Sequence, residues 1–170
     1  MRLRILSLLV GLLAIGAFVM ASDPGPWFDP VNCAFCKQFA NEPGLLDHMH
    51  HEYHQLHNGM MQITHVDTEF ESAFSKAQVG VGGVVKDMQA GKPVTTCRHC
   101  SAQGALFQAG VMPDLVKRGD DYIIVFTSSD TTLVKQIQEF GKNSADAVAA
   151  MAAEKKAAKA APAPRFFASG

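Results

Sequence analysis

The chain has 170 residues, with 15 Lys and Arg against 16 Asp and Glu, so its net charge is close to zero. This balance excludes the strongly basic surface that nucleic-acid-binding proteins usually carry. The length is sufficient for one domain with its own hydrophobic core. The sequence has neither the glycine-rich phosphate loop nor the nucleophile elbow that mark common nucleotide-binding proteins and hydrolases.

Residues 1–21 have the pattern of a secretory signal peptide. Arg2 and Arg4 precede an apolar stretch, and Val19-Met20-Ala21 fits a cleavage site. The apolar stretch approaches the length of a membrane-spanning helix, so an uncleaved N-terminal anchor is the alternative. We therefore expect an exported protein, periplasmic or secreted, with no stable membrane span after cleavage.

The first half of the remaining chain predicts a helix that carries the sequence CAFC, then a second helix, a strand and a long helix. The second helix is expected from Leu45 to His57, because its apolar residues recur three and four positions apart. Asn58-Gly59 would end this helix, although the same dipeptide is also typical of a two-residue hairpin turn between strands. The first helix, the strand and the long helix are expected at about 33–41, 60–66 and 68–90.

The second half predicts a similar series of elements. A short helix is expected from Pro113 to Arg118, ending at Gly119. The extended pieces Pro30-Val31 and 92–95 are candidates for edge strands. The stretch from about Ala149 is expected to extend the last helix and then to become a disordered tail rich in Ala, Lys and Pro, assigned to residues 154–170. The other helices and the strand are expected at about 97–109, 131–153 and 121–128.

These two series predict an α+β fold with an internal duplication. Each apolar strand ends at an Asp-Thr pair, Asp67-Thr68 and Asp130-Thr131, 63 positions apart. We expect one domain, 22–153, built from two helix–(helix)–strand–helix repeats at about 27–90 and 91–153. Helices would cover a small sheet around a pseudo-two-fold axis. The alternative is that two such units look alike without common origin.

All four cysteines occur in two Cys-x-x-Cys pairs, Cys33 with Cys36 and Cys97 with Cys100. Asn32 and Thr96 precede the pairs and are N-cap residue types, so each pair is expected in the first turn of a helix. A helix N-terminus favours the thiolate. If a pseudo-two-fold brings the pairs together, four thiolates can hold zinc, or copper in its reduced state.

Export leaves other states of the cysteines open, because thiols tend to pair in oxidising compartments. The pairs can form local disulfides or cross-link the two halves, in a stapled interaction module without metal. A thiol–disulfide oxidoreductase is a further alternative. Covalent haem attachment is excluded, since Lys37 and Ser101, not histidines, follow the pairs.

Six of the seven histidines lie between residues 48 and 65. On the expected helix, His50, His54 and His57 form one stripe, which predicts an auxiliary set of metal ligands. The alternative is a solvated polar face. We therefore expect an exported transition-metal-binding protein, rather than an enzyme, for metal sequestration, sensing or delivery. A protein partner or a homodimer stays open, and no nucleic acid is expected.

Overall fold

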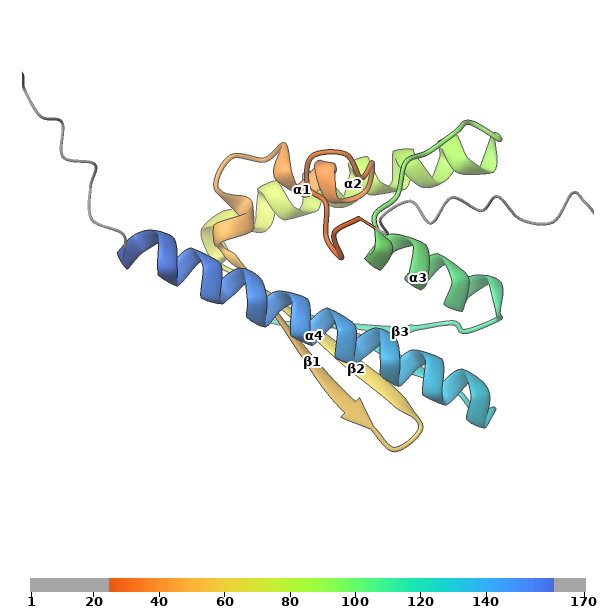
Figure 1. Cartoon of the computed structure of the whole chain (residues 1–170). Coiled ribbons are helices and arrows are strands. Elements are labelled where there is room, and N and C mark those ends of the chain that lie inside the picture. The colour runs from red at the N-terminus through yellow and green to blue at the C-terminus, as the bar shows by residue number, and fades with distance from the viewer. Residues whose placement is uncertain (1–24, 161–170) are drawn as a thin grey trace, which may run out of the picture.

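The computed structural model describes residues 25–160 of the chain, so the predicted signal peptide lies outside the described residues. These residues form an α+β fold of four α-helices and four strands, with two short 3₁₀ turns, η1 and η2 (Figure 1). In chain order the elements are α1 (Cys36–Ala40), η1 (Leu45–Asp47), β1 (Met49–Leu56), β2 (Gly59–Val66), η2 (Thr68–Phe70), α2 (Glu71–Gln89), α3 (Arg98–Gln108), β3 (Asp114–Arg118), β4 (Asp121–Thr127) and α4 (Thr131–Ala160).

The strands form one antiparallel sheet in the order β1-β2-β4-β3. Each outer strand is joined to its central neighbour by a two-residue turn, at 57–58 and at 119–120. Gly59 begins β2 where the backbone of β4 approaches closely, because a Cβ at this position would lie 1.9 Å from the Phe126 carbonyl oxygen. The predicted strands at 60–66 and 121–128 are confirmed as the central pair, β2 and β4.

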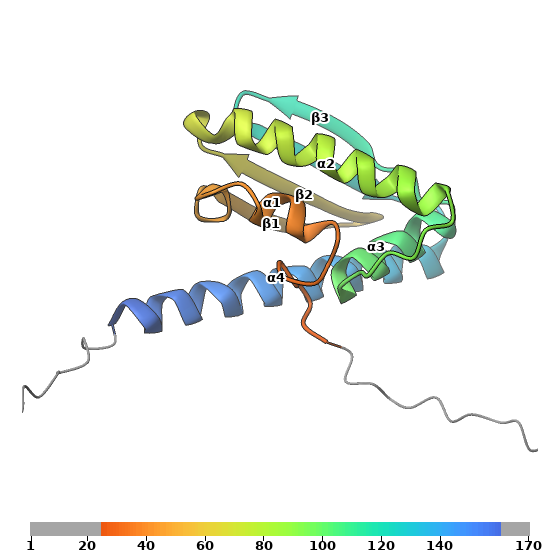
Figure 2. The same cartoon turned by 90° about the horizontal axis from the view of Figure 1, so that it is seen from above.

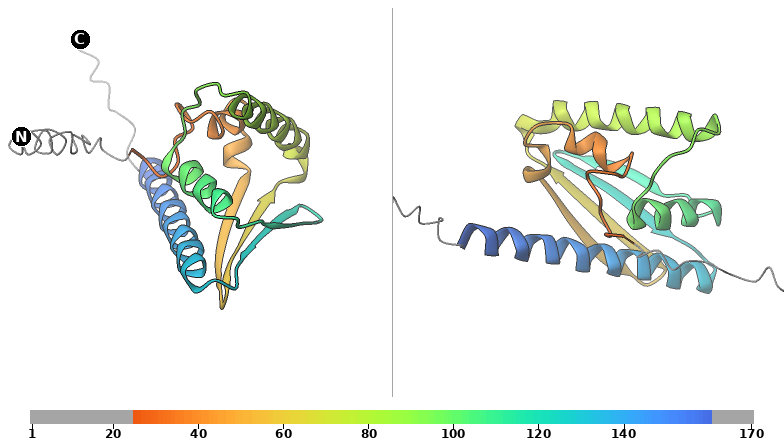
Figure 3. Two further views of the ribbon diagram at one scale, coloured as in Figure 1. Left: turned by 90° about the vertical axis from the view of Figure 1, so that its right-hand side faces the viewer. Right: turned by 45° about the horizontal axis from the view of Figure 1, so that its top comes forward.

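The helices pack on one face of this sheet (Figure 3). Met60 and Phe126 contact apolar residues of α3 and α4, including Leu106 and Ile137, in one buried cluster. A second cluster joins Val66 to Leu45 and to Phe74 and Ala77 of α2. Inward residues of β2 are fully or nearly buried and alternate with more exposed outward ones, as expected for a sheet covered on one side.

Two predicted helices are wrong. The region from Leu45 to His57 is η1 followed by β1, and Pro113–Arg118 contains β3. In β1 the more buried residues alternate with exposed ones, but polar His51 is among the inward residues. Because this inner face is polar, the apolar residues of the segment do not recur every two positions, as they would in a half-buried strand. Leu and Met instead recur three and four positions apart, which is the spacing of a helix.

Other boundaries also differ from the prediction. Pro30-Val31 and residues 92–95 form no strand. Helix α4 continues to Ala160, so residues 154–160 belong to a helix and not to a disordered tail; residues 161–170 lie outside the described part. The helix–hairpin–helix order occurs twice along the chain. A true duplication with a pseudo-two-fold axis stays a prediction.

Candidate metal centre

The two Cys-x-x-Cys pairs meet where α1 and the beginning of α3 lie between α2 and α4 (Figure 2). Cys33 Sγ lies 3.6 Å from Cys100 Sγ, and Cys36 Sγ lies 3.6 Å from Cys97 Sγ. Cys36 and Cys100 are also in contact, at 4.0 Å. All four sulfur atoms lie within 4.8 Å of one another. Each of these three contacts joins one pair to the other.

These distances suit a tetrahedral metal site. Four sulfurs at about 2.3 Å from a central ion form a tetrahedron with edges of about 3.8 Å. The sulfur atoms are therefore already arranged at nearly the separation that a metal ion requires. All four cysteines are free, so the structure contains none of the disulfides considered as alternatives. Within residues 25–160, they are the one group of three or more His, Cys, Asp or Glu side chains that converge in this way.

Short backbone contacts place the cysteines. The Asp29 carboxylate accepts hydrogen bonds from the backbone N–H groups of Val31 and Asn32, which shapes the turn before Cys33. These bonds, and one from the Asn32 side chain, lower the pKa of Asp29. The N–H of Ala34, inside the first pair, donates to the carbonyl of Thr95 at 2.9 Å. That bond ties the first Cys-x-x-Cys segment to the chain just before the second.

The helix caps differ from those expected. Helix α1 begins only at Cys36, with Phe35 as its N-cap, and α3 begins at Arg98, with Cys97 as its N-cap. The predicted caps Asn32 and Thr96 are therefore wrong. Cys33 lies in a turn before α1, and the Lys37 N–H donates to its carbonyl at 2.9 Å. The predicted helix at 97–109 is confirmed within a residue at each end.

The electrostatics of the cluster favour a thiolate at Cys97 beside protonated Cys36 and Cys100. Hydrogen bonds from Cys100 and Cys36 lower the pKa of Cys97. The contact with Cys100 lowers the pKa of Cys36, but the contact with Cys97, burial and nearby thiolate charge outweigh it and raise this pKa to about 12. Contacts with Cys36 and Cys97, together with burial, raise the pKa of Cys100. A cation at the centre would remove the repulsion that keeps these thiols protonated.

One side of the cluster is closed and the other is partly open. Cys33 and Cys97 are buried, with 0% and 6% of their surfaces exposed. Cys36 and Cys100 are half-buried. A metal ion in this position would be shielded by protein on one side and within reach of small ligands on the other.

An aromatic layer supports the segments that carry the cysteines. The ring of His99, between the cysteines of the second pair, packs against Trp27, Phe28 and Phe140. The backbone N–H of His99 donates to the carbonyl of Trp27 at 3.0 Å, and the Trp27 Nε1–H donates to the Ser144 hydroxyl of α4 at 3.1 Å. These bonds attach the segment before the first pair to α3 and α4.

Two histidines of this interior are held neutral. Burial lowers the pKa of His99 to about 4, although the thiolate of Cys97 opposes the shift. Burial also lowers the pKa of His51, on the inner face of β1, to about 4. His99 Nε2 is buried and has no hydrogen-bond partner within residues 25–160. Sequence reasoning placed His51 toward solvent, which is wrong, and it left out His99, although the place of His99 inside CRHC was a visible signal.

The predicted histidine stripe is not assembled. His50 and His54 are exposed residues of β1 on the face that the helices do not cover, and His57 lies in the turn that follows. His54 Nε2 is 2.9 Å from a Glu52 carboxylate oxygen. His50 stands opposite His65 in the sheet, and their ring centroids are 6.4 Å apart. A strand places alternate residues on one face, so the helical spacing that united the three no longer applies.

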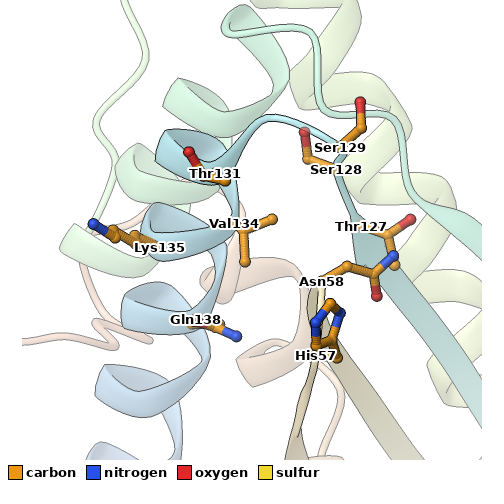
Figure 4. A pocket seen from close by; sticks show the side chains of 9 residues that line it. All are labelled: His57, Asn58, Thr127, Ser128, Ser129, Thr131, Val134, Lys135 and Gln138. Atoms are coloured by element: carbon orange, nitrogen blue, oxygen red, sulfur yellow. The ribbon is translucent and has the colours of Figure 1, made fainter.

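His57 instead borders a shallow hollow beside the beginning of α4 (Figure 4). The hollow opens between the β1–β2 turn and the first turns of α4. No cysteine lines this hollow, so it does not connect His57 with the thiol cluster. Its lining residues are His57, Asn58, Thr127, Ser128, Ser129, Thr131, Val134, Lys135 and Gln138.

Comparison with known proteins adds no family to this description. The chain matches no protein-family model, and neither a curated protein nor a solved structure is significantly similar to it. Among residues 25–160, none of the helices has both the length and the apolar composition needed to cross a membrane.

Proposed function

We propose that this protein is an exported, periplasmic-type metal-binding protein that holds one transition-metal ion between Cys33, Cys36, Cys97 and Cys100. The observation that supports it is the convergence of the four sulfurs at 3.6–4.0 Å along three of their contacts. Zinc suits a closed tetrahedral set of four thiolates, and thiolates also suit Cu(I). The role would be to sequester, sense or deliver the ion.

The position of the cluster supports a contribution of the metal to folding. The cluster joins the beginning of α1 to that of α3, and the contacting cysteines are 61 to 67 residues apart in sequence. An ion bound to all four thiolates would cross-link these distant segments. Because the unfolded chain does not hold the four thiolates together, metal binding would stabilise the folded state.

Native mass spectrometry with thiol alkylation tests the proposal. Protein taken from the exported fraction of the producing cells should carry one metal ion per chain, and its four thiols should become alkylatable only after chelation. Elemental analysis of the same sample identifies the ion. A chain four hydrogen masses lighter, without metal, would overturn the metal site and indicate two disulfides. Ready cycling of one pair at a mildly oxidising potential would indicate an oxidoreductase instead.

The auxiliary ligand set of His50, His54 and His57 stays a prediction, and the geometry supports it less than the cysteines. The triple alanine variant tests it against the same native mass measurement. Because four thiolates complete a tetrahedral site, we expect the stoichiometry of one ion per chain to persist. A second bound ion in the natural protein that the triple variant loses would restore a role for the histidines.

A further inference from the structure

Strand β3 is an open edge of the sheet. It pairs with β4 alone, and all five of its residues are exposed. The apolar side chains Leu115 and Val116 have 73% and 53% of their surfaces in solvent. Figure 3 shows the β3–β4 hairpin at the margin of the molecule. An exposed edge with apolar residues is a template for pairing with another strand.

The register of the β3–β4 hairpin determines which backbone groups face outward. Arg118 and Asp121 flank a two-residue turn, and the residue pairs of an antiparallel hairpin alternate between hydrogen-bonded and non-hydrogen-bonded. The pairs at 118, 116 and 114 are therefore the bonded ones, and the N–H and C=O groups of Leu115 and Lys117 point to the open edge. Within residues 25–160, no turn or side chain supplies a hydrogen bond to them.

The lysine of this strand, Lys117, does not prevent another strand from pairing with the open edge of β3. Charged side chains, lysine above all, commonly prevent edge strands from pairing. Lys117 Nζ instead lies 3.0 Å from a Glu71 carboxylate oxygen of α2 and 2.9 Å from the Tyr122 hydroxyl. Its charge is thus held over the inner face of the sheet, beside the helices.

The other charged residues of β3, Asp114 and Arg118, lie at opposite ends of the strand, so the charges of a second, antiparallel copy of β3 would complement them. Asp114, Val116 and Arg118 lie on the outward face of the sheet, and neither Asp114 nor Arg118 makes an ion pair within the described part of the chain. If a second β3 runs antiparallel with Val116 opposite Val116, each Asp114 faces an Arg118. Opposite charges at directly opposed positions stabilise a strand pair.

We infer that two copies of this chain associate through β3, antiparallel and centred on Val116, to form one continuous eight-stranded sheet. In this register Leu115 and the partner's Lys117 exchange both backbone hydrogen bonds, as their outward-facing groups require. If the register shifted by one residue, the outward-facing backbone groups of one strand would meet residues whose N–H and C=O groups already bond β4. The result is a closed two-fold dimer. The interface is short, so we expect a dissociation constant of about 10–100 µM.

A charge-reversal pair tests the inference by sedimentation equilibrium. The natural protein should show a concentration-dependent doubling of mass. Asp114→Arg places two arginines opposite each other at both ends and should weaken association at least ~tenfold, and so should Arg118→Asp. An equimolar mixture of the two variants restores both ion pairs and should form a one-to-one heterodimer. Glu69→Arg, an exposed charge reversal outside the strand, is the matched control and should dimerise normally.

A cross-linking variant makes the test independent of charge and folding effects. Val116→Cys in the metal-loaded protein should form a covalent dimer under mild oxidation, because opposed residues of a non-hydrogen-bonded pair lie within disulfide reach. Leu115→Cys, whose opposite residue is the partner's Lys117, should not. A natural protein that stays monomeric at several hundred micromolar, a mixture of variants that fails to pair, or equal cross-linking of both cysteine variants would overturn the inference. None of these outcomes depends on the metal identity.

Discussion

Cys33 Sγ and Cys100 Sγ lie 3.6 Å apart, although 67 residues separate them in sequence. This contact crosses between the two Cys-x-x-Cys pairs, as does the 3.6 Å contact of Cys36 with Cys97. Because all four sulfur atoms lie within 4.8 Å of one another, they surround a common centre that a metal ion could occupy.

Replacing Cys100 by Ser should weaken metal binding at least ~100-fold, because a hydroxyl is a poor ligand for a soft or borderline ion. Competition with a chromophoric chelator measures the affinity. Ser72→Ala, at an exposed position of α2, is the control and should retain the natural affinity. Unchanged binding in the serine variant would contradict the four-thiolate site.

Removing the metal should lower the stability of the fold. At a free metal concentration a thousandfold above the dissociation constant, binding stabilises the folded state by about 4 kcal/mol. Thermal unfolding before and after chelation, both under reducing conditions, measures the difference. The Cys100→Ser variant provides the comparison, since its midpoint should respond little to chelation. Equal midpoints for the natural protein with and without metal would contradict the structural role.

Replacing Ser144 by Ala should destabilise the protein by about 1–3 kcal/mol, because the partly buried Trp27 Nε1–H loses its acceptor. Ser144 is fully buried and also donates to the Phe140 carbonyl. Chemical unfolding followed by circular dichroism measures the loss. With Trp27→Phe, the double variant should lose less than the sum of the single variants, since both remove one bond. Ser72→Ala, on the exposed side of α2, should change little.

Replacing Gly59 by Ala should destabilise the sheet by more than about 3 kcal/mol or prevent folding. The added Cβ would lie 1.9 Å from the Phe126 carbonyl oxygen, and the backbone of a central strand cannot move away cheaply. Gly82→Ala is the control, because a Cβ at this position in α2 meets no atom within 4 Å. We expect it to stabilise the helix by up to about 1 kcal/mol. Thermal unfolding distinguishes the two, and similar midpoints would show that β2 and β4 do not approach as described.

Acidification should destabilise the folded state partly through His51. Burial holds its pKa at about 4, whereas the imidazole of the unfolded chain has its ordinary pKa of 6.5. Between these values the unfolded state binds more protons, so the free energy of unfolding falls as the pH falls from about 6.5 to 4. The loss is about 3 kcal/mol.

The test compares His51→Gln with Ser72→Ala over this pH interval by chemical unfolding. The His51 variant should show a shallower fall of stability with pH, with the contribution of His99 retained. Ser72 is exposed and carries no titratable group, so its replacement should leave the slope unchanged. Parallel pH profiles for the natural protein and both variants would contradict the assignment.

The sequence pattern predicted the strands β2 and β4 and the helices α3 and α4. The run Tyr122–Phe126 is a strand of apolar, largely β-branched residues, and the run before Val66 combines Met60, Met61 and Ile63 with the β-branched Thr64. The beginnings of α3 and α4 were predicted within one residue, but α4 continues beyond the predicted end at 153 to Ala160. The prediction failed in β1, where inward-facing His51 and Gln55 are polar, and in β3, where every residue is exposed. Neither strand has the hydrophobic alternation by which a sequence identifies a half-buried strand.

The sequence alone supplied the four thiol groups of the candidate site, and the tertiary structure decided whether they meet. Two Cys-x-x-Cys pairs specify thiol ligands, because only the order of residues is needed to supply them. Whether four sulfurs meet depends on how α1 and α3 pack, through contacts such as Ala34 with Thr95 and Trp27 with Ser144 that link residues distant in sequence. The histidines show the opposite case. They cluster in the sequence, but His50, His54 and His57 do not form the predicted stripe, because the segment expected to be a helix is a strand followed by a turn. Proximity along the chain is a local property, whereas convergence at a site results from the packing of the whole fold.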